Sequence, residues 1–167
     1  MGIFDWIGSQ PSDIQLIVKL VLAALLGGLV GLERDFHGHE AGLRTNMMIA
    51  ISACLFTVLS IEAFPTGVGA GGFRDTARVA AQIVVGVGFL GAGAVIQSRD
   101  RVRGLTTAAT IWLVAAVGMA IGTGEYLAGI FTSIFALAVL VLLAPLSKRL
   151  ETRARNQSEV EKKTQSK

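Results

Sequence analysis

The sequence predicts an all-α, polytopic helical membrane protein with about five transmembrane helices, and three observations support this prediction. The 167-residue chain is 52% hydrophobic and only 16% charged, with a mean hydropathy of +0.61, which is more apolar than a soluble domain of this size. Five runs are long enough to cross a hydrocarbon core of roughly 30 Å as helices. Lysine and arginine gather in alternate connections between these runs.

The five predicted spans cover residues 14–32, 46–64, 76–97, 105–122 and 125–145. Together they form a predicted transmembrane domain at 14–146. Residues 1–13 place Trp6 beside acidic residues, and we expect an interfacial segment there because tryptophan favours the headgroup level. Residues 147–167 are polar and charged, and we expect a disordered cytoplasmic tail.

The distribution of positive charge predicts the topology. Two arginines lie in the loop at 33–45, three in the loop at 98–104, and four lysines or arginines lie between residues 147 and 155. The connections on the opposite side hold Arg74 alone. Since positive charge favours the cytoplasmic side, the N-terminus is expected to face outward and the C-terminus to face the cytoplasm.

One face of the third span combines an acid, a base, an amide and two glycines. A charged residue at the bilayer centre costs about 2.5–3.5 kcal/mol, so this face is expected to meet protein or water rather than lipid. Two interpretations stay open: an ion pair that holds helices together, or a ligand or ion pathway. At about 100° per residue, the residues within about 80° of one another are Asp75, Arg78, Gln82, Gly86, Phe89 and Gly93.

A second group of polar residues lies near the predicted cytoplasmic boundary. One interpretation is interfacial anchoring by arginines whose charged ends reach the headgroups. The other is a functional polar cluster, because a glutamate and several threonines add hydrogen-bonding groups on the same side. The members are Glu33 and Arg34 at the end of the first span, Arg44 at the start of the second, and Arg103, Thr106 and Thr107 on one face of the fourth.

Glycines in the first and third spans indicate close helix packing. We expect this packing to occur within the chain, with a homo-oligomer interface as the alternative. Three of these glycines match the spacing of a dinucleotide-binding loop, but they lie inside an apolar run rather than between a strand and a helix. The packing glycines are Gly27 and Gly31 in the first span, and Gly86, Gly88, Gly91 and Gly93 in the third.

No group of residues indicates an enzyme, a cofactor or a metal site. His37, His39 and Glu40 lie in a short charged loop, which is typical of a solvated surface rather than of a metal centre. No serine, cysteine or lysine is paired with a base as a nucleophile requires. The single cysteine, Cys54, excludes a disulfide within one chain. The expected partners are the lipid bilayer and membrane proteins, and not nucleic acid.

Four motifs together resemble the MgtC/SapB family of bacterial inner-membrane proteins. They are GLERD at 31–35, AGLRT at 41–45, DTARVAAQIVVGVGFLGAG at 75–93 and VRGLTTAATIW at 102–112. The resemblance covers most of residues 14–145 in the family's order, and it adds Thr45 to the cytoplasmic polar cluster. The chain departs from the family pattern at Asn46, where a histidine is frequent.

The resemblance implies a multi-pass protein of the bacterial inner (plasma) membrane, linked to magnesium limitation, acid stress and virulence. The best-known members inhibit the proton-driven ATP synthase, so it implies a non-enzymatic regulator of a membrane complex. Those members carry a soluble C-terminal domain of the ACT type, whereas a short charged tail follows Leu150 here, which suggests a short form. The alternative function is a divalent cation (magnesium) transporter or channel that uses the face of Asp75, Arg78 and Gln82.

Overall fold

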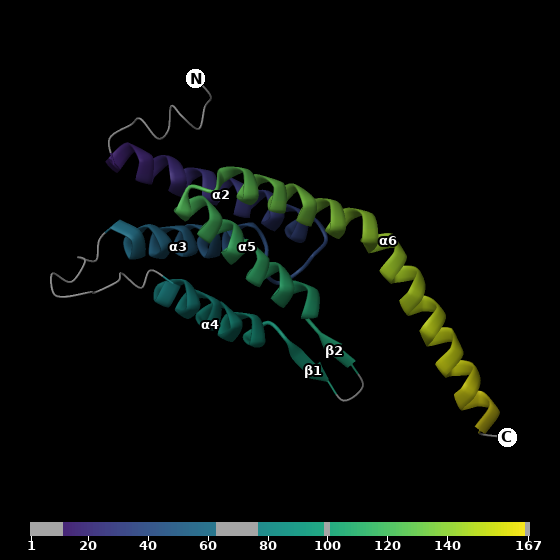
Figure 1. Cartoon of the computed structure of the whole chain (residues 1–167). Helices are drawn as coiled ribbons and strands as arrows, with labels where there is room; N and C mark the ends of the chain where they lie inside the picture. Colours follow the sequence, from purple (N-terminus) through teal and green to yellow (C-terminus); the bar gives the residue numbers. More distant parts are fainter. Residues whose placement is uncertain (1–11, 63–76, 99–100, 166–167) are drawn as a thin grey trace. The chain divides into compact units, whose positions relative to one another are not determined.

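The computed structural model describes residues 12–62, 77–98 and 101–165, and this part contains five helices and one short hairpin (Figure 1). Four of its helical segments are long and apolar enough to cross a membrane. The predicted all-α, multi-pass membrane fold is therefore confirmed. The elements are α2 (Ser12–Phe36), α3 (Leu43–Glu62), α4 (Ala77–Gly93), β1 (Ile96–Ser98), β2 (Arg101–Arg103), α5 (Leu105–Thr123) and α6 (Tyr126–Gln165).

The chain forms two compact units, Met1–Ser133 and Ile134–Lys167. Helices α2 to α5, the hairpin and the start of α6 belong to the first unit. The rest of α6 belongs to the second. All the site residues predicted from the sequence fall within the range of the first unit.

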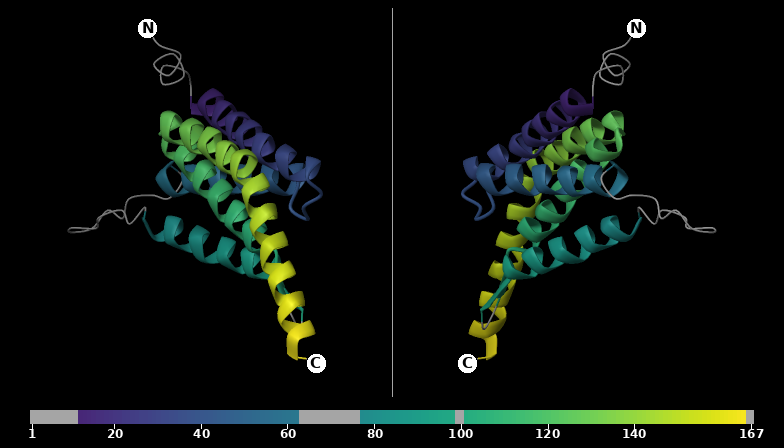
Figure 2. Two further views of the ribbon diagram at one scale, coloured as in Figure 1. Left: turned by 90° about the vertical axis from the view of Figure 1, so that its right-hand side faces the viewer. Right: turned by 90° about the vertical axis from the view of Figure 1, so that its left-hand side faces the viewer.

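Helices α2, α3 and α5 pack side by side as the core of the first unit (Figure 2). Glycines make this packing possible. A Cβ atom added to Gly27 would lie 2.6 Å from the Cβ of Ala50, and one added to Gly122 would lie 2.7 Å from the Cβ of Thr57. Gly118 is placed just as tightly against the carbonyl oxygen of Ala50. A side chain at any of these glycines would push the helices apart, so the glycines set the distances between helix axes.

The third span is shorter than the sequence indicates. The sequence predicts a helix over 76–97, whereas α4 has 17 residues and ends at Gly93. At about 1.5 Å per residue, this helix is about 25 Å long, less than a hydrocarbon core of roughly 30 Å. Its apolar part, Arg78–Gly93, is correspondingly shorter than the other candidate spans.

A two-stranded hairpin replaces the end of this span and most of the predicted arginine loop. Strands β1 and β2 pair antiparallel, with Ile96 opposite Arg103 and Gln97 opposite Val102. Isoleucine and valine favour strands over helices. Gly104 follows with φ of +86°, a left-handed conformation that suits glycine, and α5 begins directly after it.

Helix α6 continues through Gln165, so residues 147–165, which the sequence predicts to be disordered, are helical in the structure. The low hydrophobicity of this segment favours disorder. However, it is also rich in glutamate, lysine, arginine and glutamine, which have high helix propensity. The apolar part of α6 ends at Pro145.

Candidate functional site

Two regions of the first unit combine polar groups in unusual surroundings. The loop between α2 and α3 and the β1–β2 hairpin lie at the same end of this unit, opposite the turn between α5 and α6 (Figure 1). We call it the arginine-rich end, because Arg34, Arg44 and Arg103 lie there. The second region is a groove between α3 and α4.

Two polar side chains fix the loop between α2 and α3. The Asp35 carboxylate accepts a hydrogen bond of 2.8 Å from the backbone N–H of Leu43, and this satisfies a free donor at the start of α3. The Asn46 amide donates to the carbonyl oxygens of Ala41, at 2.8 Å, and Gly42, at 2.9 Å. The residue that departs from the family motif, Asn46, is thus fully buried and holds the loop against α3.

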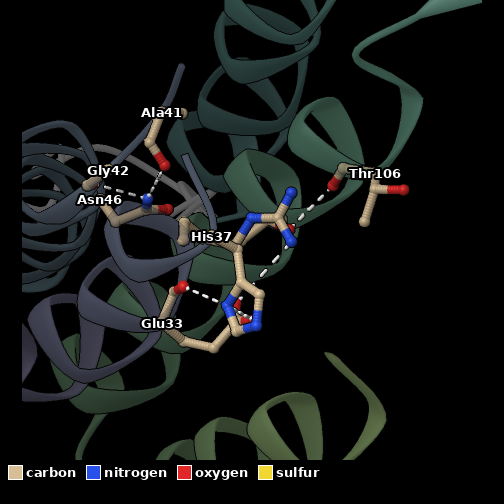
Figure 3. A network of polar contacts seen from close by, with 8 residues as sticks. Glu33, His37, Ala41, Gly42, Asn46 and Thr106 are labelled. Carbon is tan, nitrogen blue, oxygen red and sulfur yellow. Dashed lines mark hydrogen bonds and ion pairs between the residues drawn. The ribbon is translucent and has the colours of Figure 1, made fainter. Parts of the chain in front are cut away.

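The Glu33 carboxylate interacts with both the buried Arg34 and the exposed His37, and Figure 3 shows Glu33 and His37 together. One carboxylate oxygen of Glu33 lies 3.0 Å from Nδ1 of His37, and the other lies 3.7 Å from Nη1 of Arg34. The Arg34 side chain is 3% exposed, whereas that of His37 is 43% exposed. Figure 3 also shows Asn46 of α3 and Thr106 of α5 in the same network of polar contacts. The end of α2 therefore carries ionic groups that reach from the interior to the surface.

Four buried polar atoms in this cluster have no hydrogen-bond partner within the described part of the chain. They are Oε2 of Glu33, Nε and Nη2 of Arg34, and Oδ1 of Asn46. Buried polar groups are normally paired, and an unpaired one costs about 1–3 kcal/mol. The cluster therefore retains two donors and two acceptors that water or a bound group could satisfy.

The remaining members of the predicted polar cluster lie at the same end but divide by burial. Arg44, Thr45, Arg103 and Thr106 are exposed, whereas Thr107 is buried. The structure therefore brings Glu33 and Arg34 into one ion pair and leaves the other arginines at the surface. This division depends on which helix face is covered, and the spacing of the residues does not reveal it.

His39 lies in the loop beside the same cluster. Its backbone N–H donates to the carbonyl oxygen of Arg34 at 3.0 Å. Partial burial of the ring and then the positive charge of Arg34 lower the pKa of His39. Among the described residues, no group of three or more histidine, cysteine, aspartate or glutamate side chains could hold a metal ion.

A buried lysine at the opposite end is not among the residues that the sequence singles out as a site. Nζ of Lys19 donates to the carbonyl oxygen of Gly122 at 3.1 Å and lies 4.0 Å from a carboxylate oxygen of Glu62. Carbonyl groups at the end of a helix carry partial negative charge, which favours a cation there. The sequence signal is a lone lysine in an apolar span, but its partner is 103 residues away and is identified only by the fold.

The groove between α3 and α4 has a volume of about 530 Å³. Each wall includes residues spaced four apart, which form a straight stripe along a helix. Most of the lining is apolar, and Ser52 and Gln82 contribute the polar groups. The two stripes are Met48, Ser52 and Phe56 on α3, and Gln82, Gly86 and Leu90 on α4.

Helix α4 contacts the rest of the first unit along one narrow stripe. Its buried residues are Ile83, Val87 and Gly91, again four residues apart. The other described residues of α4 from Val79 to Gly93 are exposed or half-buried. Most of the surface of this apolar helix is therefore uncovered by the described part of the chain.

The two sets of predicted packing glycines have different surroundings. Gly27 and Gly31 are enclosed between α2 and α3. A Cβ on Gly31 would lie 2.8 Å from backbone atoms of Gly42 and Leu43, at the start of α3. A Cβ on Gly86, Gly88 or Gly93 would have no neighbour within 4 Å. The first set is used within the chain, whereas these three glycines of α4 face open space.

The predicted polar face of the third span is described in part. Asp75 lies outside the described residues. Arg78 and Gln82 are exposed at the start of α4, and Gln82 lines the groove.

Comparisons with known proteins agree on one family. The model of the MgtC family matches residues 20–149. YhiD of Escherichia coli strain K12, whose name proposes that it transports magnesium, is 42% identical over 137 residues, which are 81% of this chain and 64% of YhiD. Protein MgtC of Brucella abortus is 46% identical over 132 residues, which are 79% of this chain and 52% of that protein. Protein MgtC of Salmonella typhimurium is 40% identical over 134 residues, which are 80% of this chain and 54% of that protein.

These curated relatives are longer than the region they share with the chain, which spans about half to two thirds of their length. No solved structure matches the chain at a significant level.

Proposed function

Because this chain belongs to the MgtC family, we propose that it is a non-enzymatic regulator of the bacterial inner membrane. It acts by docking on another membrane complex, such as the proton-driven ATP synthase. The observation that carries this proposal is the face of α4 that the described residues of the first unit leave uncovered, with its exposed glycines and an exposed glutamine.

Helices in a bilayer associate through close packing of small residues and through hydrogen bonds between helices. The α4 face offers both, because Gly86, Gly88 and Gly93 admit a close neighbour and Gln82 supplies an amide. Lipid tails provide no partner for that amide. A face of this composition supports contact with a further membrane protein.

The packing of the core favours a regulator over a channel through α2, α3 and α5. The backbones approach closely at Gly27 and Gly122, where a Cβ would meet neighbouring atoms at 2.6 and 2.7 Å. At these two points the helices leave no room for a hydrated ion. The docking function needs no such passage.

The arginine-rich end supplies electrostatics for docking. Arg44 and Arg103 are exposed there, and positive surface charge favours encounter with an acidic partner surface. The buried pair of Glu33 and Arg34 lies at the same end, and it retains polar atoms that have no hydrogen-bond partner within the described part of the chain. A cytoplasmic loop of the partner complex would meet this end while a membrane helix meets α4.

The proposal is tested with inverted membrane vesicles prepared with and without the protein. ATP hydrolysis and ATP-driven proton pumping are measured in the same vesicles. A regulator of the ATP synthase lowers both rates by the same factor, and Arg103→Ala weakens the effect at equal expression. Loss of pumping together with faster hydrolysis would instead identify a proton leak and overturn the proposal.

A divalent cation transporter is the second candidate, and Gln82 in the groove together with the name of YhiD favours it. Magnesium prefers several oxygen ligands, and the nearby Arg78 repels a cation. The test is magnesium flux into liposomes that contain the purified protein, with Asp75→Asn as the variant. Flux that Asp75→Asn abolishes would favour transport, and an absence of flux would exclude it.

A further inference from the structure

The guanidinium group of Arg34 has one unpaired edge inside the protein. Its side chain is 3% exposed, and Nε and Nη2 have no hydrogen-bond partner within the described part of the chain. These two nitrogens lie on the same edge of the planar group, so their N–H bonds point the same way. The nitrogen closest to Glu33 is Nη1, which is not part of this edge. Two parallel donors of this kind fit two oxygens of a carboxylate, phosphate or sulfate.

Two acceptors accompany this edge, and contacts on their other side fix both. Oε1 of Glu33 lies 3.0 Å from Nδ1 of His37, whereas Oε2 is buried and unpaired among the described residues. The amide nitrogen of Asn46 donates to the carbonyl oxygens of Ala41 and Gly42, which leaves Oδ1 as the unpaired end (Figure 3). The Glu33 side chain is 9% exposed and Asn46 is fully buried. The cluster therefore needs a ligand that both accepts and donates hydrogen bonds.

The donors and acceptors are close enough for one small ligand to reach both. Nη1 of Arg34 lies 3.7 Å from Oε2 of Glu33, and it belongs to the same rigid guanidinium group as the unpaired edge. This distance is too long for a hydrogen bond, so the two charges attract each other without pairing these atoms. Asn46 packs against α2 one turn before Arg34, because a Cβ on Gly31 would lie 3.0 Å from the Cβ of Asn46.

We propose that this cluster binds one phosphate monoanion, either inorganic dihydrogen phosphate or a singly protonated phosphate monoester. Two phosphate oxygens accept hydrogen bonds from Nε and Nη2 of Arg34. A P–OH group donates to Oε2 of Glu33, and the second P–OH of inorganic phosphate donates to Oδ1 of Asn46. This inference goes beyond the proposed function, and it does not depend on docking through α4.

Other ligands satisfy only part of this inventory. Carboxylates and sulfate carry no proton at neutral pH, so either one would place a like charge against Oε2 of Glu33 without donating to it. A divalent cation would contact the oxygens of Glu33 and Asn46. It would also leave the Arg34 donors unpaired beside a second positive charge, and hard cations prefer six or more oxygen ligands. The combination of donors and acceptors therefore favours a protonated phosphate.

The surroundings favour the approach of an anion. Arg44 and Arg103 are exposed at the same end, and positive surface charge raises the local concentration of anions. The pair of Glu33 and Arg34 is neutral as a whole, so the bound monoanion adds one negative charge that these arginines offset. His37 is 43% exposed and contacts Glu33, so the ligand reaches the buried atoms from its side of the α2–α3 loop.

The test measures phosphate binding to the purified full chain in phosphate-free detergent solution. Isothermal titration calorimetry is carried out with sodium phosphate and, as the matched control, with sodium sulfate at equal ionic strength. The pH is about 6, where phosphate groups retain much of their second proton. Phosphate should bind at least about tenfold more tightly than sulfate, because a site built for a hydroxyl group rejects an analogue without one. Phosphate should also raise the melting temperature, since it binds the native state.

Three variants separate the donors from the acceptors. Arg34→Lys keeps the charge but removes the two parallel donors, and it should weaken phosphate binding at least about tenfold. Arg44→Lys makes the same change at an exposed site and should leave the affinity within about twofold. Glu33→Gln introduces an amide that can also donate, so phosphate and sulfate should then bind within about twofold of each other. Melting temperatures without ligand show that each variant is folded, and the comparison of the two anions on the wild type needs no variant.

A second arm distinguishes the two sources of a phosphate monoanion. The chain is placed in lipid-free detergent micelles, or in micelles that contain phosphatidic acid or phosphatidylglycerol. Phosphatidic acid carries a phosphate monoester, whereas phosphatidylglycerol carries a diester without a P–OH group. A response to inorganic phosphate in lipid-free micelles identifies a soluble ligand. A rise in melting temperature with phosphatidic acid alone identifies a lipid headgroup, and either result supports the proposal.

Equal affinity of the wild type for phosphate and sulfate would overturn the proposal. So would unchanged phosphate binding by Arg34→Lys, or the absence of any response to phosphate and to phosphatidic acid. Stabilisation by magnesium chloride that Glu33→Gln abolishes, without a response to phosphate, would identify a cation site instead. The two proposals fail separately. Selective phosphate binding without inhibition of the ATP synthase would refute only the proposed regulation, whereas inhibition without selective phosphate binding would refute only this site.

Discussion

Arg34 is a buried cation, and within the described part of the chain it forms an ion pair with the adjacent Glu33. The side chains are 3% and 9% exposed, and the closest charged atoms are 3.7 Å apart. Removal of one member of a buried pair leaves an uncompensated charge and costs about 3–5 kcal/mol. We therefore expect Arg34→Met to lower the free energy of unfolding by about 3 kcal/mol, measured by denaturant unfolding of the purified protein in detergent.

The matched control is Arg44→Met, which removes an exposed arginine from the same end and should change the free energy of unfolding by less than about 0.5 kcal/mol. The double variant Glu33→Gln with Arg34→Met should recover part of the loss, because it removes both charges. Equal stability of Arg34→Met and Arg44→Met would contradict a structural role for the buried pair.

His39 makes the stability of the loop depend on pH. Its pKa is lowered in the folded protein by burial and by the charge of Arg34, so the folded state favours the neutral ring. The neutral His39 ring therefore contributes to the free energy of unfolding above its unfolded pKa of about 6.5. This contribution is lost as the pH falls through the folded pKa. In unfolding experiments between about pH 7 and 5, the free energy of unfolding should therefore fall less steeply with decreasing pH for His39→Gln than for the wild type. A steeper loss in the variant would contradict this sign.

Single residues show where sequence reasoning reaches its limit. The motifs identify Glu33 and Arg34, but their spacing cannot distinguish a buried arginine from an interfacial one. Asn46 attracts notice only as a departure from a family pattern, although it holds the α2–α3 loop. Lys19 and Gly122 become partners only when α2 and α5 are packed.

The helices differ in how their glycines are used, and this difference is measurable. Gly27→Ala places a Cβ 2.6 Å from that of Ala50, so it should lower the free energy of unfolding by about 1–3 kcal/mol. Gly86→Ala meets open space and should raise it by up to about 1 kcal/mol, because alanine favours the helix. Thermal unfolding of the purified variants tests both signs, and Gly88→Ala should behave like Gly86→Ala. A loss of stability in Gly86→Ala would show that its side of α4 is covered within the chain.

The sequence predicts where the helices lie but not how they are covered. The apolar runs give all five helices, because length and hydropathy are local properties. The predicted end of the third span is wrong by several residues. Val95 adjoins the β1–β2 hairpin and Ile96 and Val102 belong to it, and an apolar window cannot distinguish such residues from the end of a helix. The glycine pattern is similar in α2 and α4, and only the packing of α3 against α2 shows which set is used internally.

The topology of the whole molecule follows from the charge bias and is open to direct test. The loop around Gly38 is expected in the cytoplasm and the turn at Gly124 outside. Alkaline phosphatase inserted at Gly124 should therefore be active, and the same enzyme inserted at Gly38 inactive, with a cytoplasmic fluorescent reporter giving the reverse. Equal phosphatase activity at both sites would contradict an alternating arrangement of the spans.

At the scale of the first unit, a tightly packed core of α2, α3 and α5 stands beside α4, which the described residues of this unit leave largely uncovered. This contrast underlies the proposed regulation of a membrane complex. The most direct measurement compares ATP hydrolysis and proton pumping in inverted vesicles that contain equal amounts of wild type or Gly86→Leu. The expected result is that wild type lowers both rates by the same factor, whereas Gly86→Leu leaves both near the rates of vesicles without the protein. Equal inhibition by both chains, or no inhibition by either, would contradict docking on the ATP synthase through α4.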